Sequence, residues 1–556
     1  MCVLASVMSI LDATVVNVAQ RTFIAQFHST QAIVAWTMTG YTLALATVIP
    51  LAGWAADRFG TKRLFMGSVL AFTVGSLLCA IAPNIASLVG FRVLQGVGGG
   101  MLMPLAFTIL ARAAGPKRLG RLMAVLGIPM LLGPIGGPIL GGWLIDTYGW
   151  EWIFRINLPI GMTAIILAAV VLPRDHPAPS ETFDFVGMLL LSPGLAAFLY
   201  GVSSIPSRGT LADHHVWLPA VIGLALIGGF VVHALYRADH PLINLQLFTN
   251  RVVTLANSAM FLFAVAFFGV GLLFPSYFQQ VLHQTPFQSG VHLIPQGLGA
   301  MLTMPLAGTF MDRRGPGKVV LVGITLIAAG MGTFAYGVWQ QANYRPSLLA
   351  GLAIMGMGMG CTMTPLSGSA VQALAPQQIA RGSTLISVNQ QVAGSVGTAL
   401  MSMILTSQVN HSENLVAANK LAALQENAAR RGVQLDPSAI PPRALAPDFT
   451  KNALHEMSQA YGVVFLVAVV LVVSTYIPAA FLPKNPLHPR IRCRYRQINR
   501  MRRQPCGKRS DQNRAPLALA CEQHPRDALG GPHRIGRLHA RVDGVVEPQH
   551  RKPVHQ

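Results

Sequence analysis

Residues 53–63 read Gly53-Trp-Ala-Ala-Asp57-Arg58-Phe59-Gly60-Thr61-Lys62-Arg63 and form a short charged segment between two long apolar runs. The runs at 33–52 and 64–82 contain no charged residue, and each is long enough to cross a bilayer as a helix. So short a connection predicts a tight helical hairpin with its turn at the membrane surface. Gly53 and Gly60 permit a bend and a close approach of backbones. Lys62 and Arg63 are expected to hold the turn on the cytoplasmic side.

A second copy of this segment begins about 255 residues later, at Gly308-Thr-Phe-Met-Asp312-Arg313-Arg314-Gly315-Pro316-Gly317-Lys318. Two further matches follow at nearly the same offset. Met103-Pro-Leu pairs with Thr364-Pro-Leu, and Pro116-Lys-Arg-Leu-Gly-Arg121 pairs with Pro376-Gln-Gln-Ile-Ala-Arg381. Three matches in the same order indicate an internal duplication. The chain is therefore predicted to contain two membrane halves related by a repeat.

Composition sets the class of the protein. Only 11% of the 556 residues are charged, whereas about a quarter are charged in a soluble protein, and the mean hydropathy is +0.49. Many apolar runs of membrane-spanning length predict an all-α polytopic membrane protein. The six cysteines show no metal or disulfide spacing, and no Walker-type phosphate loop is present. We therefore expect neither an enzyme nor an ATP-driven pump, and no cofactor or metal.

The apolar runs predict fourteen transmembrane helices, at 1–20, 33–52, 64–82, 85–110, 119–145, 152–172, 183–202, 216–236, 252–278, 289–311, 318–338, 347–371, 383–407 and 460–482. The repeats fall on helices 2–5 and 10–13. This predicts an N-terminal six-helix half at 1–175, two inserted helices at 176–250, and a C-terminal six-helix half at 251–484.

Basic residues predict the orientation, with both termini in the cytoplasm of a multi-pass cell-membrane protein. The turns on the predicted inner side contain Arg58, Lys62, Arg63, Arg112, Lys117, Arg118, Arg121, Arg174, Arg237, Arg251, Arg313, Arg314, Lys318 and Arg381. The short outer connections contain only Arg21, Arg155, Arg208 and Arg345.

Two segments lie outside the predicted bundle. The external loop at 408–459 contains a polar helical stretch, which is either a solvated surface helix or a docking surface for a periplasmic adaptor. The tail at 485–556 has no apolar periodicity and is predicted to be disordered. From Lys484 onward, 17 Lys and Arg against 5 Asp and Glu supply +12 of the net charge of +21. No nucleic-acid-binding fold accompanies this charge, so nucleic acid is not expected as a partner. The tail is interpreted as a read-through or out-of-frame extension.

Asp12 lies within the first apolar run, in Ser9-Ile-Leu-Asp12-Ala-Thr14-Val-Val-Asn17. A carboxylate at membrane depth costs a few kcal/mol and is expected to face a cavity or a partner, or to be protonated. Thr14 and Asn17 are candidate hydrogen-bonding partners. Asp12 is thus a candidate proton-coupling residue, with a structural acid near a helix end as the alternative.

Arg92 and Gln95 lie about one turn apart in the fourth predicted helix, in Phe91-Arg92-Val-Leu-Gln95-Gly96. A buried guanidinium stays charged and must be paired. Arg92 is therefore a second candidate for proton coupling, with a structural arginine near the helix end as the alternative. Gln95 is a candidate for the cavity wall.

The fifth predicted helix carries Gly127-Ile-Pro129-Met-Leu-Leu-Gly133-Pro134-Ile-Gly136-Gly137-Pro138-Ile-Leu-Gly141-Gly142. In a membrane bundle such a composition allows close packing and a bend, which predicts a hinge or a seal between the halves. In the second half, Asn389 and Gln390 are candidates for a polar cavity wall, as is Asn17 in the first half.

Taken together, these stretches resemble the Major Facilitator Superfamily, and within it the fourteen-span drug:proton antiporters of the EmrB/QacA type. The matching stretches are Leu11–Val18, Gly53–Arg63, Phe91–Gly96, Gly133–Pro138 and Trp152–Gly161. The resemblance covers about 1–482. One departure is Gln20-Arg21 where the family's first helix usually ends in Leu-Pro.

The resemblance implies export of amphipathic, often cationic drugs in exchange for protons by alternating access. It implies that Asp12 is the membrane acid and Arg92 the proton-relay arginine. The implied gating loop comprises Gly53, Asp57, Arg58, Gly60, Lys62 and Arg63, with Asp312 and Arg313 in the second copy. The implied antiporter motif comprises Gly133, Pro134, Gly137 and Gly141. Alternatives are a dedicated exporter of one metabolite, lipid or antibiotic, a proton-coupled importer, and a non-transporting receptor.

Overall fold

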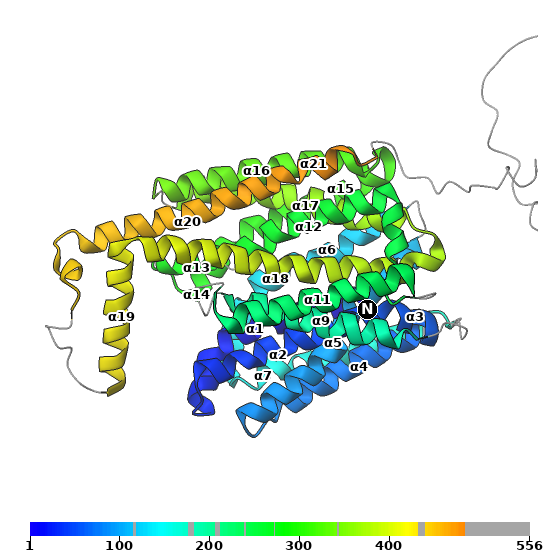
Figure 1. Ribbon diagram of the computed structural model, residues 1–556, viewed down its shortest axis with the longest axis horizontal. Helices are drawn as coiled ribbons and strands as arrows, with labels where there is room; N and C mark the ends of the chain where they lie inside the picture. The colour runs from blue at the N-terminus through cyan, green and yellow to red at the C-terminus, as the bar shows by residue number, and fades with distance from the viewer. Residues whose placement is uncertain are drawn as a thin grey trace, which may run out of the picture. The chain divides into compact units, whose positions relative to one another are not determined.

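The computed structural model describes residues 1–114, 118–175, 183–205, 212–237, 241–271, 273–341, 344–431 and 440–483. Within these ranges the regular structure is helical and no β-strand is assigned. Residues 1–489 form one compact unit, whose helices are labelled in Figure 1. The tail at 485–556 lies outside the described residues.

The first predicted half consists of helices that follow the apolar runs closely. Their bounds are α1 (Cys2–Gln26), α2 (Gln31–Val48), η1 (Ile49–Leu51), α3 (Ala52–Phe59), α4 (Thr61–Ala80), α5 (Ile85–Ala114), α6 (Leu119–Tyr148), α7 (Trp152–Arg155) and α8 (Asn157–Val171). The first helix extends six residues beyond the predicted end at 20, because Phe23 and Ile24 pack into a buried cluster after the polar break at Gln20-Arg21.

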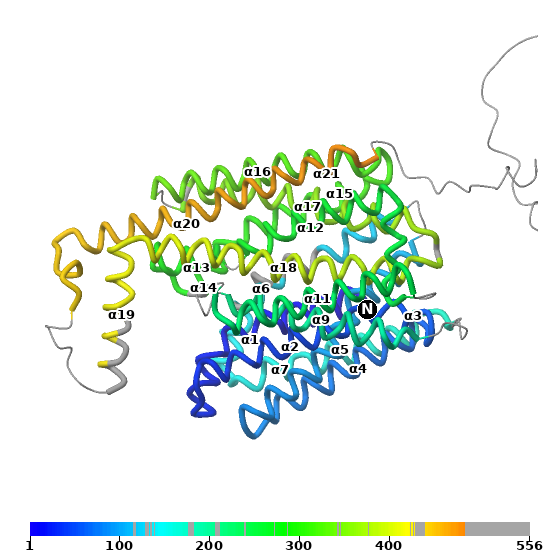
Figure 2. Tube along the Cα trace, in the orientation of Figure 1, coloured from blue at the N-terminus to red at the C-terminus, as the bar shows by residue number. Residues whose placement is uncertain are grey.

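The inserted pair, α9 (Phe185–Ser203) and α11 (His214–Tyr236), packs helix against helix. The chain continues as η2 (Leu245–Thr249), α12 (Arg251–Gly271), α13 (Leu273–Gln280), α14 (Pro286–His292), α15 (Ile294–Arg314), α16 (Pro316–Trp339), η3 (Tyr344–Leu348), α17 (Leu349–Gln372), η4 (Pro376–Gln378), α18 (Ile379–His411), α19 (Glu413–Arg431), η6 (Pro442–Leu445), α20 (Phe449–Ser474) and α21 (Tyr476–Ala480). Figure 2 shows α20 running alongside α16.

Among the described residues, 12 helical segments are long and apolar enough to cross a membrane. The two other predicted spans fall in α6 and in α14 with α15. The polar side chains of α15, among them Gln296, Thr303 and Asp312, lower its hydropathy. The total of fourteen spans therefore stays a prediction, whereas a multi-pass helical membrane fold is established.

The predicted external loop at 408–459 is largely helical in its described part. It contains the end of α18, all of α19 and the start of α20, which begins at Phe449 rather than at 460. The predicted start was late because apolar content marks only the part of a helix inside the membrane. The polar turns of α20 before residue 460 carry no such signal.

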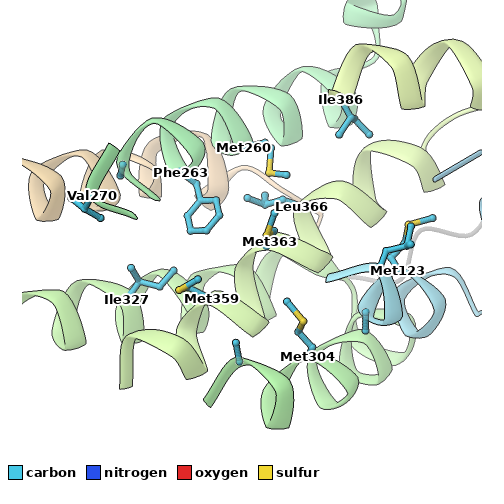
Figure 3. Packing of buried hydrophobic residues seen from close by; sticks show 14 of the residues in the cluster. Met123, Met260, Phe263, Val270, Met304, Ile327, Met359, Met363, Leu366 and Ile386 are labelled. Atoms are coloured by element: carbon cyan, nitrogen blue, oxygen red, sulfur yellow. The ribbon is translucent and has the colours of Figure 1, made fainter. Parts of the chain in front are cut away.

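Buried methionines are a feature of the packing in the second predicted half. Figure 3 shows Met260 and Phe263 of α12 close to Met363 of α17, with Met304 of α15 nearby. Met123 of α6 reaches the same cluster from the first predicted half. Methionine is unbranched and polarisable and fills irregular gaps, so this core can repack at a low energetic cost.

Glycines set the closest helix contacts. On α5, a Cβ placed on Gly98 would lie 2.5 Å from the backbone nitrogen of Phe72 and 2.8 Å from the carbonyl oxygen of Ser68, both in α4. A Cβ on Gly90, on the same helix, would have no described atom within 4 Å. Close approach of α4 and α5 therefore depends on Gly98.

We predict that Gly98→Ala destabilises the protein by about 1–3 kcal/mol, because the new methyl must push two helix backbones apart. Gly90→Ala is the matched control and should be neutral or slightly stabilising, since alanine favours helix. Thermal unfolding of the two purified variants in detergent checks this. Equal melting temperatures for both variants would contradict the packing described.

Candidate functional site

The centre of the candidate site is an ion pair buried within the first predicted half. Arg92 of α5 donates from Nη1 to Oδ2 of Asp12 on α1 at 2.5 Å. Arg92 is 0% exposed and Asp12 is 2% exposed. The two residues predicted separately as proton-coupling candidates are therefore in direct contact, and neither is exposed at the surface.

Two amide side chains donate the remaining described hydrogen bonds to the Asp12 carboxylate. Its Oδ1 accepts hydrogen bonds from Gln95 Nε2 at 2.9 Å and from Asn157 Nδ2 at 3.0 Å. The Asn157 amide also donates to Ser76 Oγ at 3.0 Å, and Ser76 Oγ donates to the carbonyl oxygen of Phe154 at 2.9 Å. The network thus joins α1, α4, α5, α7 and α8 around one carboxylate.

Arg92 is fixed on its other sides as well. Its Nε donates to the carbonyl oxygen of Thr37 at 3.1 Å, and its Nη1 donates to Gln95 Oε1 at 2.7 Å. The guanidinium carbon lies 4.1 Å from the centroid of the Tyr41 ring, which is a cation–π geometry. A permanently charged group is thereby held in an apolar interior by one carboxylate, two oxygen acceptors and a ring.

The sequence reveals the charged members of this site but not all of its neutral partners. Asn157, Ser76 and Tyr41 were not predicted, although Asn157 sits in a stretch that carried the family resemblance. The two expected partners of Asp12 lie elsewhere. Thr14 Oγ1 donates to carbonyl oxygens, that of Gly133 among them at 3.0 Å, and Asn17 is exposed.

Three glycines of the fifth predicted helix, Gly133, Gly137 and Gly141, face the helix that carries Asp12. Cβ atoms on Gly133 and Gly137 would lie 2.0 Å from Ile10 Cγ2 and Thr14 Oγ1 respectively, both on α1. Gly141 repeats the contact one turn later, 2.9 Å from Val15. This spacing of four residues forms a small-residue stripe that lets α6 and α1 pack closely.

That stripe lies within the first predicted half, so these glycines do not seal the two halves against each other. Gly127, at the other end of the stretch, does face the second half, where a Cβ would meet Met304 of α15 and Thr364 of α17. Pro134 lies in α6, but its side chain is outside the described residues.

The segment 53–63, predicted as a turn, is helical on both sides of Gly60, because the polar residues of α3 continue the helix beyond the apolar run. This segment, still called the first turn below, docks onto the second predicted half. A Cβ on Gly53 would lie 2.9 Å from Thr384 Oγ1 and 3.2 Å from the Cα of Arg381, both on α18. Asp57 accepts from Arg112 Nη2 at 3.1 Å, and its Oδ2 lies 3.9 Å from Arg381 Nε. The Asp57 carboxylate therefore links the turn to the ends of α5 and α18.

The end of the same turn is held by Asp175, an acid that was not predicted to take part. Asp175 accepts from the backbone nitrogens of Lys62 at 2.9 Å and Arg63 at 3.0 Å, and so caps the first turn of α4. Gly60 has φ +91, and a Cβ there would overlap Asp175. Lys62 Nζ donates to the carbonyl oxygens of Ala169 and Leu172 at the end of α8.

The second copy of the turn docks in the symmetric manner onto the first half. A Cβ on Gly308 would lie 2.5 Å from the carbonyl oxygen of Gly120 at the start of α6. Asp312 accepts from the backbone nitrogens of Gly120 at 3.0 Å and Arg121 at 3.3 Å. Arg313 is exposed. Each turn thus packs on the start of a helix in the opposite half, and these two helix starts are themselves related by the repeat.

The polar residues predicted for the second half divide into two kinds. Asn389 Nδ2 donates to the backbone carbonyl oxygen of Asn257 on α12 at 2.9 Å, which makes it a helix-packing contact. Gln390 Nε2, Ser387 Oγ and Asn257 Oδ1 are buried and have no hydrogen-bond partner among the described residues. Buried polar atoms without partners are uncommon and call for an explanation, such as a functional role.

One group of side chains has metal-ligand chemistry. Asp213, His214 and His215 place ligand atoms within 4.8 Å of one another at the start of α11. His214 and His215 are exposed, and the positive end of the helix dipole opposes a cation at that position. We assign no metal site to this group.

Residues 2–398 match the family model described as "Major Facilitator Superfamily". The chain belongs to the Major Facilitator Superfamily. It is 69% identical over 484 residues to "Multidrug resistance protein B homolog" of Mycobacterium tuberculosis (strain ATCC 25618 / H37Rv), covering 87% of this chain and 89% of that protein. It is 28% identical over 424 residues to "Multidrug export protein EmrB" of Escherichia coli (strain K12), covering 75% and 81% of the two chains.

Among solved structures, the proton:xylose symporter XylE bound to 6-bromo-6-deoxy-D-glucose is similar with a TM-score of 0.52 and 14% sequence identity. The match covers 87% of this chain and 96% of that chain. At this identity the likeness concerns the fold. It agrees with the family membership and with the helical membrane architecture described above.

The docking of the first turn predicts a cross-link. The test uses a background in which serine replaces the native cysteines. In it, Gly53→Cys combined with Thr384→Cys should form a disulfide under mild oxidation. A Cβ on Gly53 would touch the Thr384 side chain, and two cysteines at such a short separation can be bridged. The measurement is the electrophoretic shift after cleavage of an engineered protease site between the halves.

The control for the cross-link pairs Gly53→Cys with Gly142→Cys on α6, where a Cβ has open space around it. This pair should stay reduced under the same oxidant. Equal yields for the two pairs, or no disulfide in the first pair, would contradict the contact between α3 and α18.

Proposed function

We propose that this chain is a proton-coupled exporter of amphipathic, often cationic drugs that works by alternating access. The observation that carries the proposal is the buried carboxylate of Asp12, paired with Arg92 in the membrane interior of a Major Facilitator Superfamily chain. The relatives named for multidrug resistance and multidrug export support the substrate class. The dedicated exporter of one metabolite, lipid or antibiotic is the alternative.

Asp12 is suited to release a transported proton because its ionised form balances the buried charge of Arg92. When a proton binds, the pair becomes a lone guanidinium in a low-dielectric site, which is unfavourable. When the proton leaves, the neutral balance returns. A cationic drug that approaches the carboxylate favours the ionised form for the same electrostatic reason, so proton and drug compete at one site.

The two docked turns supply the alternating element. The excess of basic residues supports a cytoplasmic location for both turns. Their docking holds the two halves together in the described conformation. Opening toward the cytoplasm requires that Gly53 separate from α18 and Gly308 from α6. Because both contacts involve closely packed backbone atoms, they are either closed or broken, as a two-state switch requires.

The substrate surface that we propose combines methionines and a few polar groups. Met260, Met363 and Met304 are buried in the packed cluster of Figure 3, and repacking of these side chains would give an adaptable apolar surface for the drug. The amide nitrogen of Gln390, which has no partner among the described residues, offers a hydrogen bond. Flexible thioethers bind many shapes weakly rather than one shape tightly. This composition favours a broad range of drugs over a single metabolite.

The remaining partners follow from the same proposal. The chain would lie in the cytoplasmic membrane with both termini inside, exchanging drugs for protons across the lipid bilayer. The segment 408–459 would then lie outside, where α19 is either a solvated helix or the contact for a periplasmic adaptor. Ser412 and Asn414 donate to the carboxylate of Glu456 and so hold the start of α19 against α20.

The test is ethidium efflux from energised cells that express wild type or Asp12→Asn. We expect the variant to lose efflux by about tenfold or more, because a neutral amide neither carries the proton nor balances Arg92. A protonophore should abolish efflux by the wild type. Asp146→Asn, at an exposed carboxylate on α6, is the matched control and should retain efflux.

Protonophore-sensitive efflux that survives Asp12→Asn would move the proton site elsewhere. If the wild type moves no ethidium under any condition but moves one compound in a transport panel, the dedicated exporter is the correct function. The Asp12→Asn variant must be compared at equal amounts in the membrane, which immunoblotting of membrane fractions establishes.

A further inference from the structure

Asn157 is a neutral side chain that donates a hydrogen bond to the carboxylate of Asp12. It is the first residue of α8, directly after the short helix α7 and Ile156. The residue is 2% exposed. Both of its observed hydrogen bonds run inward, to Asp12 Oδ1 and to Ser76 Oγ at 3.0 Å each. Asn157 therefore connects the corner between α7 and α8 to the carboxylate.

The contacts of Asp12 describe its ionised form. Oδ1 accepts from Gln95 and Asn157, and Oδ2 accepts from Arg92. An ionised carboxylate only accepts, whereas a protonated one must also donate. All three neighbours present donors to it. A proton arriving at Oδ1 therefore requires at least one N–H group to withdraw.

Among the three donors, Asn157 is the one that can withdraw. Arg92 keeps its charge and is held by the carbonyl oxygen of Thr37 and the ring of Tyr41. Gln95 is held by Arg92, which donates to its Oε1 at 2.7 Å. Asn157 has a second acceptor in Ser76, and its two described hydrogen bonds do not involve the guanidinium. Its bond to Asp12 can therefore be lost without displacing the guanidinium or the groups that hold it.

The titratable groups that face Asp12 come from three of the helices around it. Arg92 lies on α5, Tyr41 on α2 and Cys79 on α4. In the described residues, α7 and α8 contribute the neutral groups Phe154 and Asn157, and α6 contributes the backbone carbonyl that accepts from Thr14. The response of Asn157 to a proton thus reflects hydrogen-bond chemistry and not a second charge.

We propose that Asn157 is the positioning residue that senses whether Asp12 carries a proton, by donating to the ionised carboxylate and releasing the start of α8 when the carboxyl is protonated. The inference rests on the proposed function for its role in transport. It adds a mechanical consequence to proton binding, since α8 packs against α1 and α4 and leads to Asp175 at the turn.

Asn157→Leu tests the inference with a side chain of similar volume that cannot donate. The full chain is reconstituted in liposomes, and ethidium transport driven by an imposed pH gradient is measured over a range of pH. Loss of a donor to the carboxylate strengthens proton binding, so the pH midpoint of transport should move upward by about one pH unit.

Two further variants serve as a partial replacement of the Asn157 donor and as a control. Asn157→Ser retains a hydroxyl donor at the same backbone position and should move the midpoint by less than Asn157→Leu does. Thr163→Ala is the matched control on α8, because Thr163 is exposed and bonds only to the carbonyl oxygen of Pro159 among the described residues. Its midpoint should equal that of the wild type.

A second measurement does not depend on transport. The bond from Asn157 stabilises the ionised form of Asp12 and is lost when the carboxyl takes up a proton. The difference in melting temperature between wild type and Asn157→Leu in detergent should therefore be larger at high pH than at low pH, where only the part that comes from the bond to Ser76 remains. A purely structural asparagine would give a difference that does not change with pH.

The outcomes separate this inference from the proposed function. A wild type that moves no ethidium overturns the proposed function, while a pH-dependent melting difference would still support the role of Asn157. The inference alone is overturned if the wild type transports ethidium but Asn157→Leu leaves the pH midpoint of transport unchanged and the difference in melting temperature does not vary with pH. If Asn157→Leu fails to fold, the same two measurements on Asn157→Ser decide between the outcomes.

Discussion

A permanent positive charge buried in a membrane protein constrains everything around it. The guanidinium of Arg92 cannot lose its proton, and removal of its hydration costs several kcal/mol unless other groups replace the water. Asp12 supplies the charge, Thr37 and Gln95 supply oxygen acceptors, and Tyr41 supplies a ring face. Because Asp12 is the acid that balances this charge, any proton that binds it disturbs the whole network.

The same pair is connected by contacts to the docked turns. Asp12 lies on α1, and α1 packs against the glycine stripe of α6 through Ile10 and Thr14. The start of α6 is in turn the surface on which Gly308 and Asp312 dock. Charge balance at the pair and closure of the turns thus share two packed helices. Contiguity of this kind can carry coupling between two sites, and coupling energies along it are measurable by double-mutant cycles.

The sequence predicted the repeat, the membrane class, the family and both charged residues of the site. These features leave strong local signals, because charges in apolar runs and repeated turn motifs are rare.

The directions in which side chains point were harder to predict from the sequence. Thr14 was expected beside Asp12 but turns toward Gly133, since rotation around a helix decides which face each residue occupies. Asn157 and Ser76 were missed because neutral polar residues in membrane helices are common and carry no periodic signal. Contacts between residues far apart in the sequence could not be predicted either. Asp175 caps a helix that begins more than a hundred residues earlier. The repeat alone does not place Gly53 and Gly308 against the opposite half.

The most direct test of the account is proton release from the purified protein on drug binding. The wild type in weakly buffered detergent solution is mixed with ethidium at each of a series of starting pH values, and the pH change is followed with an indicator. Competition at one carboxylate predicts that the wild type releases protons and that Asp12→Asn, which keeps an amide oxygen to accept from Arg92, releases none. Equal proton release by both proteins would contradict the assignment of Asp12 as the site where drug and proton exchange.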